Sequence, residues 1–188
     1  ARVDARRLHE AGIRPNWLAG ISIGAINAAL IAGNAPEDRI DRLQDFWNTI
    51  CEPGGALAMP ATAIRQWLSL TPMSPMLEAW AASMSAVAAL WQGQQGFFEA
   101  RTVSPFLLRD GSEGATSFYD TAPLRATLER LVDFDRINGD DSIRLTVGAT
   151  DVETGNFRYF DSRDTRSGPE HILASGALPP AFPPVEID

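Results

Sequence analysis

Lysine is absent from this 188-residue sequence, and all sixteen of its basic residues are arginine. Twenty-four acidic residues outnumber them, so the formal net charge is −8. A nucleic-acid-binding protein needs a basic stripe that displaces counterions from phosphates, and the sequence has none. It also lacks a polybasic segment for docking on an anionic membrane, although apolar insertion into a lipid surface stays open. Nucleic acid is therefore not an expected partner.

Cysteine and histidine are nearly absent, since the chain has only Cys51, His9 and His171. One cysteine cannot form an internal disulfide, and these three residues do not have the spacing of zinc ligands. We expect neither a metal site nor a cofactor.

Long apolar runs are missing as well. The most apolar stretch, 54–98, is diluted by serine and glutamine residues, so a membrane-spanning helix of about 20 residues is not expected. The sequence opens without the charged and then apolar pattern of an export signal, which makes the cytoplasm the expected location. With 45% hydrophobic and 21% charged residues, 1–188 is expected to be a single globular domain. A helical pattern starts directly at Ala1 and a strand pattern runs to Asp188, so this domain is expected to be truncated at both ends.

The apolar periodicity predicts an α/β fold. A first helix ends at Gly12, a usual helix-ending residue, and an extended run follows over 13–19. Residues 101–117 have a loop-like pattern. We expect further helices over Ile23–Ala32, 36–50, 61–70, 75–91 and 169–175, and one more that begins after a cap at Asp120 or Thr121. Strands are expected over Ile143–Thr150 and Phe157–Phe160, which form a hairpin, and from Val185 onward.

The segment Gly20-Ile21-Ser22-Ile23-Gly24 has the pattern G-x-S-x-G and lies between the extended run and the helix Ile23–Ala32. A tight turn at this place pushes the serine hydroxyl outward. The N–H of Ile23 then lies at the positive end of the helix, where it can stabilise an oxyanion. Gly20 and Gly24 are expected to avoid side-chain clashes in the turn. The pattern predicts Ser22 as a nucleophile, and an ordinary turn that carries a serine is the alternative.

A serine nucleophile needs a base. The order Ser22, then Asp151 or Asp161, then His171 is that of an α/β-hydrolase. However, the 21 residues before Ser22 cannot hold the strands and oxyanion loop that such an enzyme places ahead of its nucleophile. His171 also lies in a predicted helix, where a structural role is common, and His9 lies on an Arg-rich helix. The residues alone leave the base open.

Two segments resemble the patatin-like phospholipase family: Gly20–Ala29, GISIGAINAA, and Ala174–Val185, ASGALPPAFPPV. The segment Thr116–Asn138 and the hairpin around Thr154–Asp161 resemble a bacterial branch of that family. The resemblance spans nearly the whole chain and is least specific over 54–98. It implies a three-layer α/β/α fold and a lipid or other acyl-ester substrate.

The resemblance further implies a Ser–Asp dyad, in which Ser22 attacks the ester and an aspartate is the general base. It places a glycine-rich oxyanion loop before Ala1 and the aspartate in an Asp-Gly turn. Asp110-Gly111 lies too early in the chain for that turn, and Asp188 is a candidate. The position that we expect for the base is just beyond residue 188. The expected activity is that of a phospholipase or esterase, and residues 1–188 alone are expected to be nearly inactive.

A helical insertion or lid is expected over 36–98, rich in Met and Trp in its second part. Such side chains adapt to irregular acyl chains, and plain core packing is the alternative. A different class of function also stays open, namely a non-catalytic patatin-like domain that binds lipid or a protein partner and keeps Ser22 for the turn. The sequence gives no oligomeric state.

Overall fold

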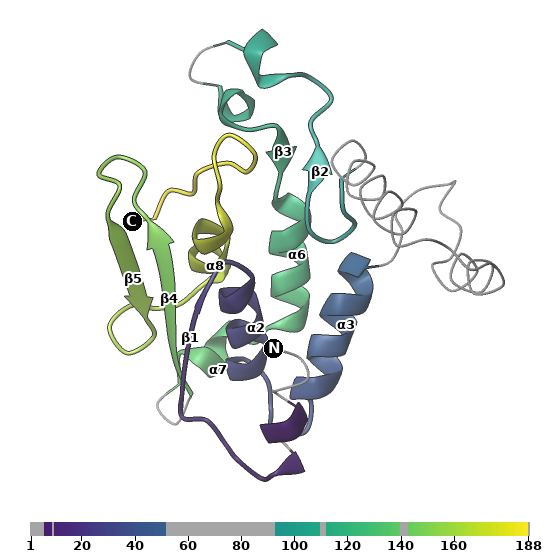
Figure 1. The fold of residues 1–188 in the computed structure, drawn as a ribbon, viewed down its shortest axis with the longest axis vertical. Helices are drawn as coiled ribbons and strands as arrows, with labels where there is room; N and C mark the ends of the chain where they lie inside the picture. The colour runs from purple at the N-terminus through teal and green to yellow at the C-terminus, as the bar shows by residue number, and fades with distance from the viewer. Residues whose placement is uncertain (1–5, 9, 52–92, 110–111, 140–142, 188) are drawn as a thin grey trace, which may run out of the picture.

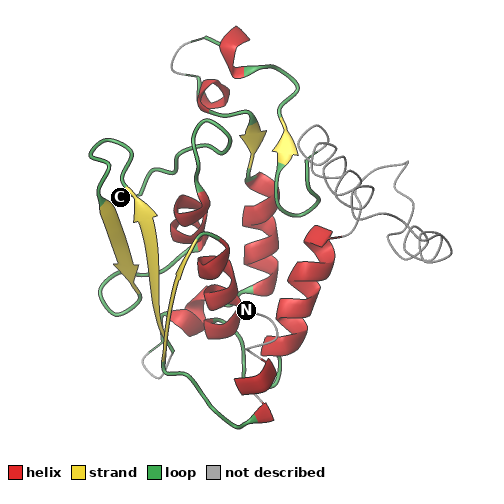
Figure 2. Ribbon diagram, in the orientation of Figure 1, coloured by secondary structure: helices red, strands yellow, loops and turns green. Residues whose placement is uncertain are grey.

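The structure is a computed structural model that describes residues 6–8, 10–51, 93–109, 112–139 and 143–187 (Figure 1). These residues form a mixed α/β arrangement, as the periodicity predicts (Figure 2). In chain order the elements are β1 (Trp17–Ile21), α2 (Ile23–Ala32), α3 (Arg39–Cys51), β2 (Glu99–Ala100), the 3-10 helices η1 (Pro105–Leu107) and η2 (Glu113–Thr116), β3 (Tyr119–Asp120), α6 (Ala122–Leu131), α7 (Phe134–Ile137), β4 (Arg144–Thr150), β5 (Phe157–Asp161) and α8 (Pro169–Gly176).

The main sheet has the strand order β1-β4-β5. β1 and β4 are parallel, with Trp17 opposite Arg144 and Ile21 opposite Gly148. β4 and β5 are antiparallel and are joined through the turn 151–156, which confirms the predicted hairpin. Because β1 and β4 are parallel, their carboxyl ends meet at the same edge of the sheet.

Helices α2, α8, α6 and α3 lie on one face of this sheet (Figure 1). α2 and α8 pack directly on the strands, and α3 and α6 pack against α2. α2 is apolar on nearly all sides because it lies between the sheet and the other helices, and its small residues allow a close approach. α3 is amphipathic and buries Leu43, Phe46 and Ile50 in the same core. A second covering layer is not found among the described residues, so the three-layer arrangement stays a prediction.

The other face of the sheet is exposed in the described part of the chain. Alternation along β4 directs Leu145 and Val147 into the core and Arg144 and Thr146 to this outer face. Large apolar side chains of β1 and β5 lie there with half or more of their surface exposed: Trp17 at 56%, Ile21 at 52%, Phe157 at 64% and Tyr159 at 66%.

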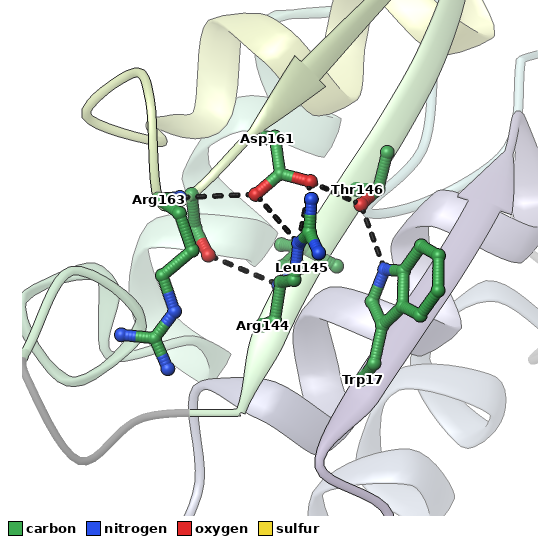
Figure 3. A network of polar contacts seen from close by, with 7 residues as sticks. Trp17, Arg144, Leu145, Thr146, Asp161 and Arg163 are labelled. Carbon is green, nitrogen blue, oxygen red and sulfur yellow. Dashed lines mark hydrogen bonds and ion pairs between the residues drawn. The ribbon is translucent and has the colours of Figure 1, made fainter.

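A polar network on the outer face joins the three strands (Figure 3). The carboxylate of Asp161 accepts hydrogen bonds from Arg144 Nε at 2.8 Å, the Thr146 hydroxyl at 2.7 Å and the Arg163 N–H at 3.1 Å. Trp17 Nε1 donates to Thr146 Oγ1 at 2.9 Å, and the Arg144 guanidinium lies 4.8 Å from the Trp17 ring. This network satisfies a buried carboxylate and fixes β1 and β5 to β4.

The segment predicted as a loop over 101–117 carries the short helices η1 and η2, and it is flanked by the antiparallel pair β2 and β3. The rings of Phe98 and Tyr119 lie 4.9 Å apart, and Phe98 also contacts Phe182, at 5.3 Å. The N–H groups of Phe118 and Tyr119 donate to the carbonyls of Pro180 and Ala181. These contacts attach the proline-rich loop to β3.

Three predicted boundaries are wrong. The extended run expected over 13–19 forms a strand only over Trp17–Ile21. The helix expected from residue 36 begins at Arg39, because Pro36–Asp38 form a turn. The strand expected from Val185 is not formed over 185–187, where none of the described strands lies alongside to pair with it. The predicted helices 61–70 and 75–91 lie outside the described residues. No helix in the described part combines the length and the apolar character needed to cross a bilayer.

Candidate functional site

The turn between β1 and α2 consists of Ser22 alone, since the strand ends at Ile21 and the helix begins at Ile23. Ser22 has φ +53° and ψ −124°, and among the described residues it is the one non-glycine residue with a positive φ. Such a backbone costs serine about 1–3 kcal/mol and persists only where the surroundings enforce it. The side chain is exposed. The predicted tight turn and helix are therefore present at the predicted residues, and the strand before them runs over Trp17–Ile21 instead of 13–19.

The two glycines of the motif differ in their surroundings. A Cβ on Gly20 would lie 2.3 Å from the carbonyl carbon of Gly24 and 2.5 Å from the backbone nitrogen of Ala25. Both are backbone atoms that cannot rotate away, so the close approach of strand and helix requires glycine at position 20. Apart from its two chain neighbours and the backbone of its own helix, a Cβ on Gly24 would have no heavy atom within 4 Å. The steric reason predicted for Gly24 is thus wrong.

The first turn of α2 presents backbone N–H groups next to Ser22. The carbonyl of Ser22 accepts hydrogen bonds from Ala25 N at 2.9 Å and Ile26 N at 3.2 Å, so the hydrogen bonding of the helix begins at Ser22 itself. The N–H groups of Ile23 and Gly24 precede these, at positions for which a helix offers no carbonyl partner. They also lie at the positive end of a ten-residue helix. Amides in this position can stabilise a negative oxygen that forms beside Ser22.

A residue that the sequence reasoning did not single out contacts this turn. Ser175, in the last turn of α8, is 8% exposed. Its Oγ accepts a hydrogen bond from the Ser22 N–H at 2.8 Å and donates to the Gly148 carbonyl at 2.5 Å. The only signal in the sequence was a serine among small apolar residues on a helix expected to pack on the sheet. Its partner could not be read locally, because Ser22 precedes it by 153 residues.

Asn27 is a second polar residue that was missed. It is buried on the otherwise apolar helix α2, where its Nδ2 donates to the Ile23 carbonyl at 2.7 Å. Its Oδ1 accepts from Trp47 Nε1 of α3 at 3.1 Å. A lone polar residue in an apolar helix was the available signal. The first turn of α2 is consequently held by α3 through Asn27 and by α8 through Ser175.

The two aspartates considered as triad members are engaged elsewhere. Asp151 lies in the hairpin turn and accepts hydrogen bonds from the N–H groups of Glu153 at 3.0 Å and Thr154 at 3.1 Å. The bonds from the Thr154 and Glu153 backbone lower the pKa of Asp151 from its ordinary value. Asp161 faces the outer side of the sheet within the network of Figure 3. Among the contacts of the described residues, none joins either carboxylate to Ser22.

His171 lies in the first turn of α8 and is 4% exposed. Its Nδ1 accepts a hydrogen bond from the Gly168 N–H at 3.0 Å, and its ring packs against Phe160 with 4.8 Å between centroids. The residue caps α8 and fills the core. No contact of the described residues brings it to Ser22.

The base candidates Asp188 and Asp110-Gly111 and the segment 54–98 stay predictions. Asp188 and Asp110-Gly111 lie outside the described residues, as does most of 54–98. A cavity of about 910 Å³ lies beside α6 and the end of β4, but Ser22 is not among the residues that line it. Within the described chain, no group of three or more histidine, cysteine, aspartate or glutamate residues is arranged to hold a metal ion.

Comparison with known proteins identifies a family. The model of the family described as Patatin-like phospholipase matches residues 3–188. No curated protein and no solved structure matches the chain. The matched range includes both the turn at Ser22 and the helix that carries Ser175.

Proposed function

The chain belongs to the patatin-like phospholipase family, and we propose that it is a serine lipid acyl hydrolase with Ser22 as the nucleophile and an aspartate as the general base. Family membership indicates hydrolysis of lipid esters. The residue roles and the dyad are the further step proposed here.

The observation that carries this proposal is the conformation of Ser22. An exposed serine with φ +53° lies directly between a strand and a helix, beside amides at the positive end of α2. An ordinary turn has no need of this backbone on a serine, since glycine adopts it without strain. Strain retained at one exposed nucleophilic residue is typical of functional sites.

The chemistry follows from these groups. Ser22 Oγ attacks the carbonyl carbon of the ester while the base takes its proton, and the oxyanion forms beside the N–H of Ile23. The carbon–oxygen bond to the alcohol breaks, and the alcohol leaves with the proton held by the base. Water then attacks the acyl-serine, gives a proton to the base and releases the fatty acid, and the proton returns to Ser22. The net reaction adds one water across the ester.

We assign the general base to an aspartate outside the described residues. Support comes from the engagement of Asp151 and Asp161 with other groups and from the position of His171 in the first turn of α8. An aspartate after residue 188 is favoured over Asp188 itself.

The test of the nucleophile is a fluorophosphonate probe together with a short-chain p-nitrophenyl ester, applied to the full-length protein. Ser22→Ala is expected to lower turnover at least about 1,000-fold and to abolish covalent labelling, because only an activated serine reacts with the probe. Ser104→Ala removes a serine that makes no capping bond in η1, and it is expected to leave both readouts unchanged.

A wild-type protein that neither reacts with the probe nor hydrolyses any ester contradicts the proposal. That outcome supports instead a non-catalytic domain that binds lipid or a protein partner. Labelling that persists in Ser22→Ala assigns the nucleophile to another serine and also contradicts it.

A further inference from the structure

The strained turn at Ser22 requires contacts that hold it. Ser22 ends the pairing of β1, since the parallel ladder with β4 runs only as far as Ile21 opposite Gly148. Beyond that pair the chain turns sharply into α2, and the Ser22 N–H cannot continue the ladder. The bond that the Ser22 N–H makes is partly buried, and an N–H shielded from water without a partner is costly, so another acceptor has to replace the missing strand.

The hydroxyl of Ser175 supplies this acceptor. It accepts from Ser22 N and donates to the carbonyl of Gly148, the same residue that pairs with Ile21. A serine hydroxyl has one donor and two acceptor positions, so both bonds can form at once. The bridge extends the connection between β1 and β4 by one step through a side chain of α8, at the point where the backbone leaves the sheet.

We propose that Ser175 is a positioning residue for the nucleophile: its buried hydroxyl joins the Ser22 N–H to the Gly148 carbonyl and thereby fixes the direction of the Ser22 side chain. This inference rests on the proposed function of Ser22. Ser175 acts through the backbone of Ser22 and takes no part in the bond changes. Its contribution is to orientation, to which rates are sensitive because a misplacement of about 1 Å can cost about 100-fold.

The experiment compares Ser175→Ala with Ser117→Ala in the full-length protein. Ser117 is a matched control, since it is also buried, accepts one hydrogen bond, from Arg101 Nε at 3.4 Å, and donates one, to the Tyr119 carbonyl at 2.9 Å. It belongs to the segment before β3 and not to the turn of Ser22. Both variants lose a buried hydroxyl with two partners, and only one of them holds Ser22.

Ser175→Ala is expected to lower kcat for a p-nitrophenyl ester about 10- to 100-fold with KM within twofold of wild type, because orientation is lost and ester binding is not. Ser117→Ala is expected to keep kcat within twofold of wild type, while its melting temperature falls by about as much as that of Ser175→Ala. Ser175→Thr keeps a hydroxyl and is expected to recover at least part of kcat. An unchanged kcat in Ser175→Ala, or an equal loss in Ser117→Ala, overturns the inference.

Amide hydrogen exchange of the peptide that contains Ser22 gives a readout independent of activity. Loss of the bridge is expected to speed exchange at the Ser22 N–H at least tenfold in Ser175→Ala and not in Ser117→Ala. If the wild type hydrolyses no ester, the proposed function fails, and exchange alone then decides whether Ser175 holds the turn. Exchange at Ser22 that is equal in wild type and Ser175→Ala overturns the inference whatever the activity. If Ser175→Ala does not fold at the assay temperature, Ser175→Thr is compared with wild type in both measurements. A folded Ser175→Thr that loses both kcat and the protection of the Ser22 N–H from exchange overturns the inference.

Discussion

At the scale of single residues, the motif around Ser22 divides into one glycine that the backbone requires and one that it does not. Gly20 faces backbone atoms of Gly24 and Ala25 within 2.5 Å of where a Cβ would lie. Gly24 occupies the second position of α2 and would direct a Cβ into open space. The two glycines of the motif therefore have different physical roles, and the sequence pattern does not distinguish them.

Gly20→Ala is expected to lower the free energy of unfolding by about 3 kcal/mol, at the upper end of overpacking costs, because the clash is with backbone and cannot be relieved by a rotamer change. Gly24→Ala is expected to be neutral or to stabilise by about 0.5–1 kcal/mol, since alanine loses less entropy than glycine in a helix. Urea unfolding of both variants measures the difference. Equal stability of the two variants contradicts the close approach at Gly20.

At the scale of elements, β4 is the strand that connects the others. Its inward residues Leu145 and Val147 enter the core, while Arg144 and Thr146 hold the carboxylate of Asp161 on the outer face. This arrangement places a charged group between two strands without leaving it unpaired, as buried charges require.

The shifted pKa of Asp161 makes the contribution of this network to stability depend on pH. Burial by itself raises the pKa, but hydrogen bonds from the Thr146 hydroxyl, the Arg163 N–H and the Arg144 guanidinium outweigh it, and the pKa is lowered. A lowered pKa in the folded state means that this contribution to stability is complete above the unfolded value of about 3.9 and is lost as pH falls through the folded pKa.

Asp161→Asn is expected to lower the free energy of unfolding at pH 7 by about 1–2 kcal/mol, a value reduced by the partial exposure of Arg144. The gap between variant and wild type is expected to narrow as pH falls below about 4. The control is Asp135→Asn, which breaks an ion pair to Arg166 in which both side chains are highly exposed and is expected to change little. Chemical unfolding from pH 3 to pH 7 measures these differences, and a constant gap over that range contradicts the assignment.

At the scale of the whole molecule, the site is assembled from distant parts of the chain. The proposed nucleophile comes from the turn after β1, its support comes from α8 and β4, and the proposed base comes from outside the described residues. The parallel pairing of β1 and β4 brings the turn after β1 and the end of β4 to one edge of the sheet. Activity is therefore expected to require more than the nucleophile and its turn.

Residues 1–188 alone are expected to turn over a p-nitrophenyl ester about 100- to 10,000-fold more slowly than the full-length protein, because a general base contributes by that factor. In the full-length protein, Asp151→Asn and His171→Gln are expected to keep turnover within about threefold. Substantial turnover by residues 1–188 that Ser22→Ala abolishes contradicts a base outside them. A large loss in His171→Gln supports a Ser–His–Asp triad instead.

Local elements were the part of the fold that the sequence predicted well. The helix Ile23–Ala32 was predicted at its observed bounds, and the hairpin of β4 and β5 within one residue, since apolar periodicity and turn residues act over short distances. The start of α3 and the absence of a strand at Val185 were not predicted. A proline-containing turn can precede a helix as well as begin it, and an extended pattern becomes a strand only where a partner strand lies beside it.

The sequence by itself determined which residues form the turn and that Ser22 stands between a strand and a helix, because glycine at position 20 and the apolar segments on either side impose that geometry locally. Only the tertiary structure decided that Ser175 holds the turn and that Asp161 is bound by Arg144 and Thr146. Those partners are set by the pairing of β4 with β5 and by the packing of α8 on the sheet. Contacts between residues so far apart in the chain leave no periodic signal in the sequence, so they become visible only when the chain is folded.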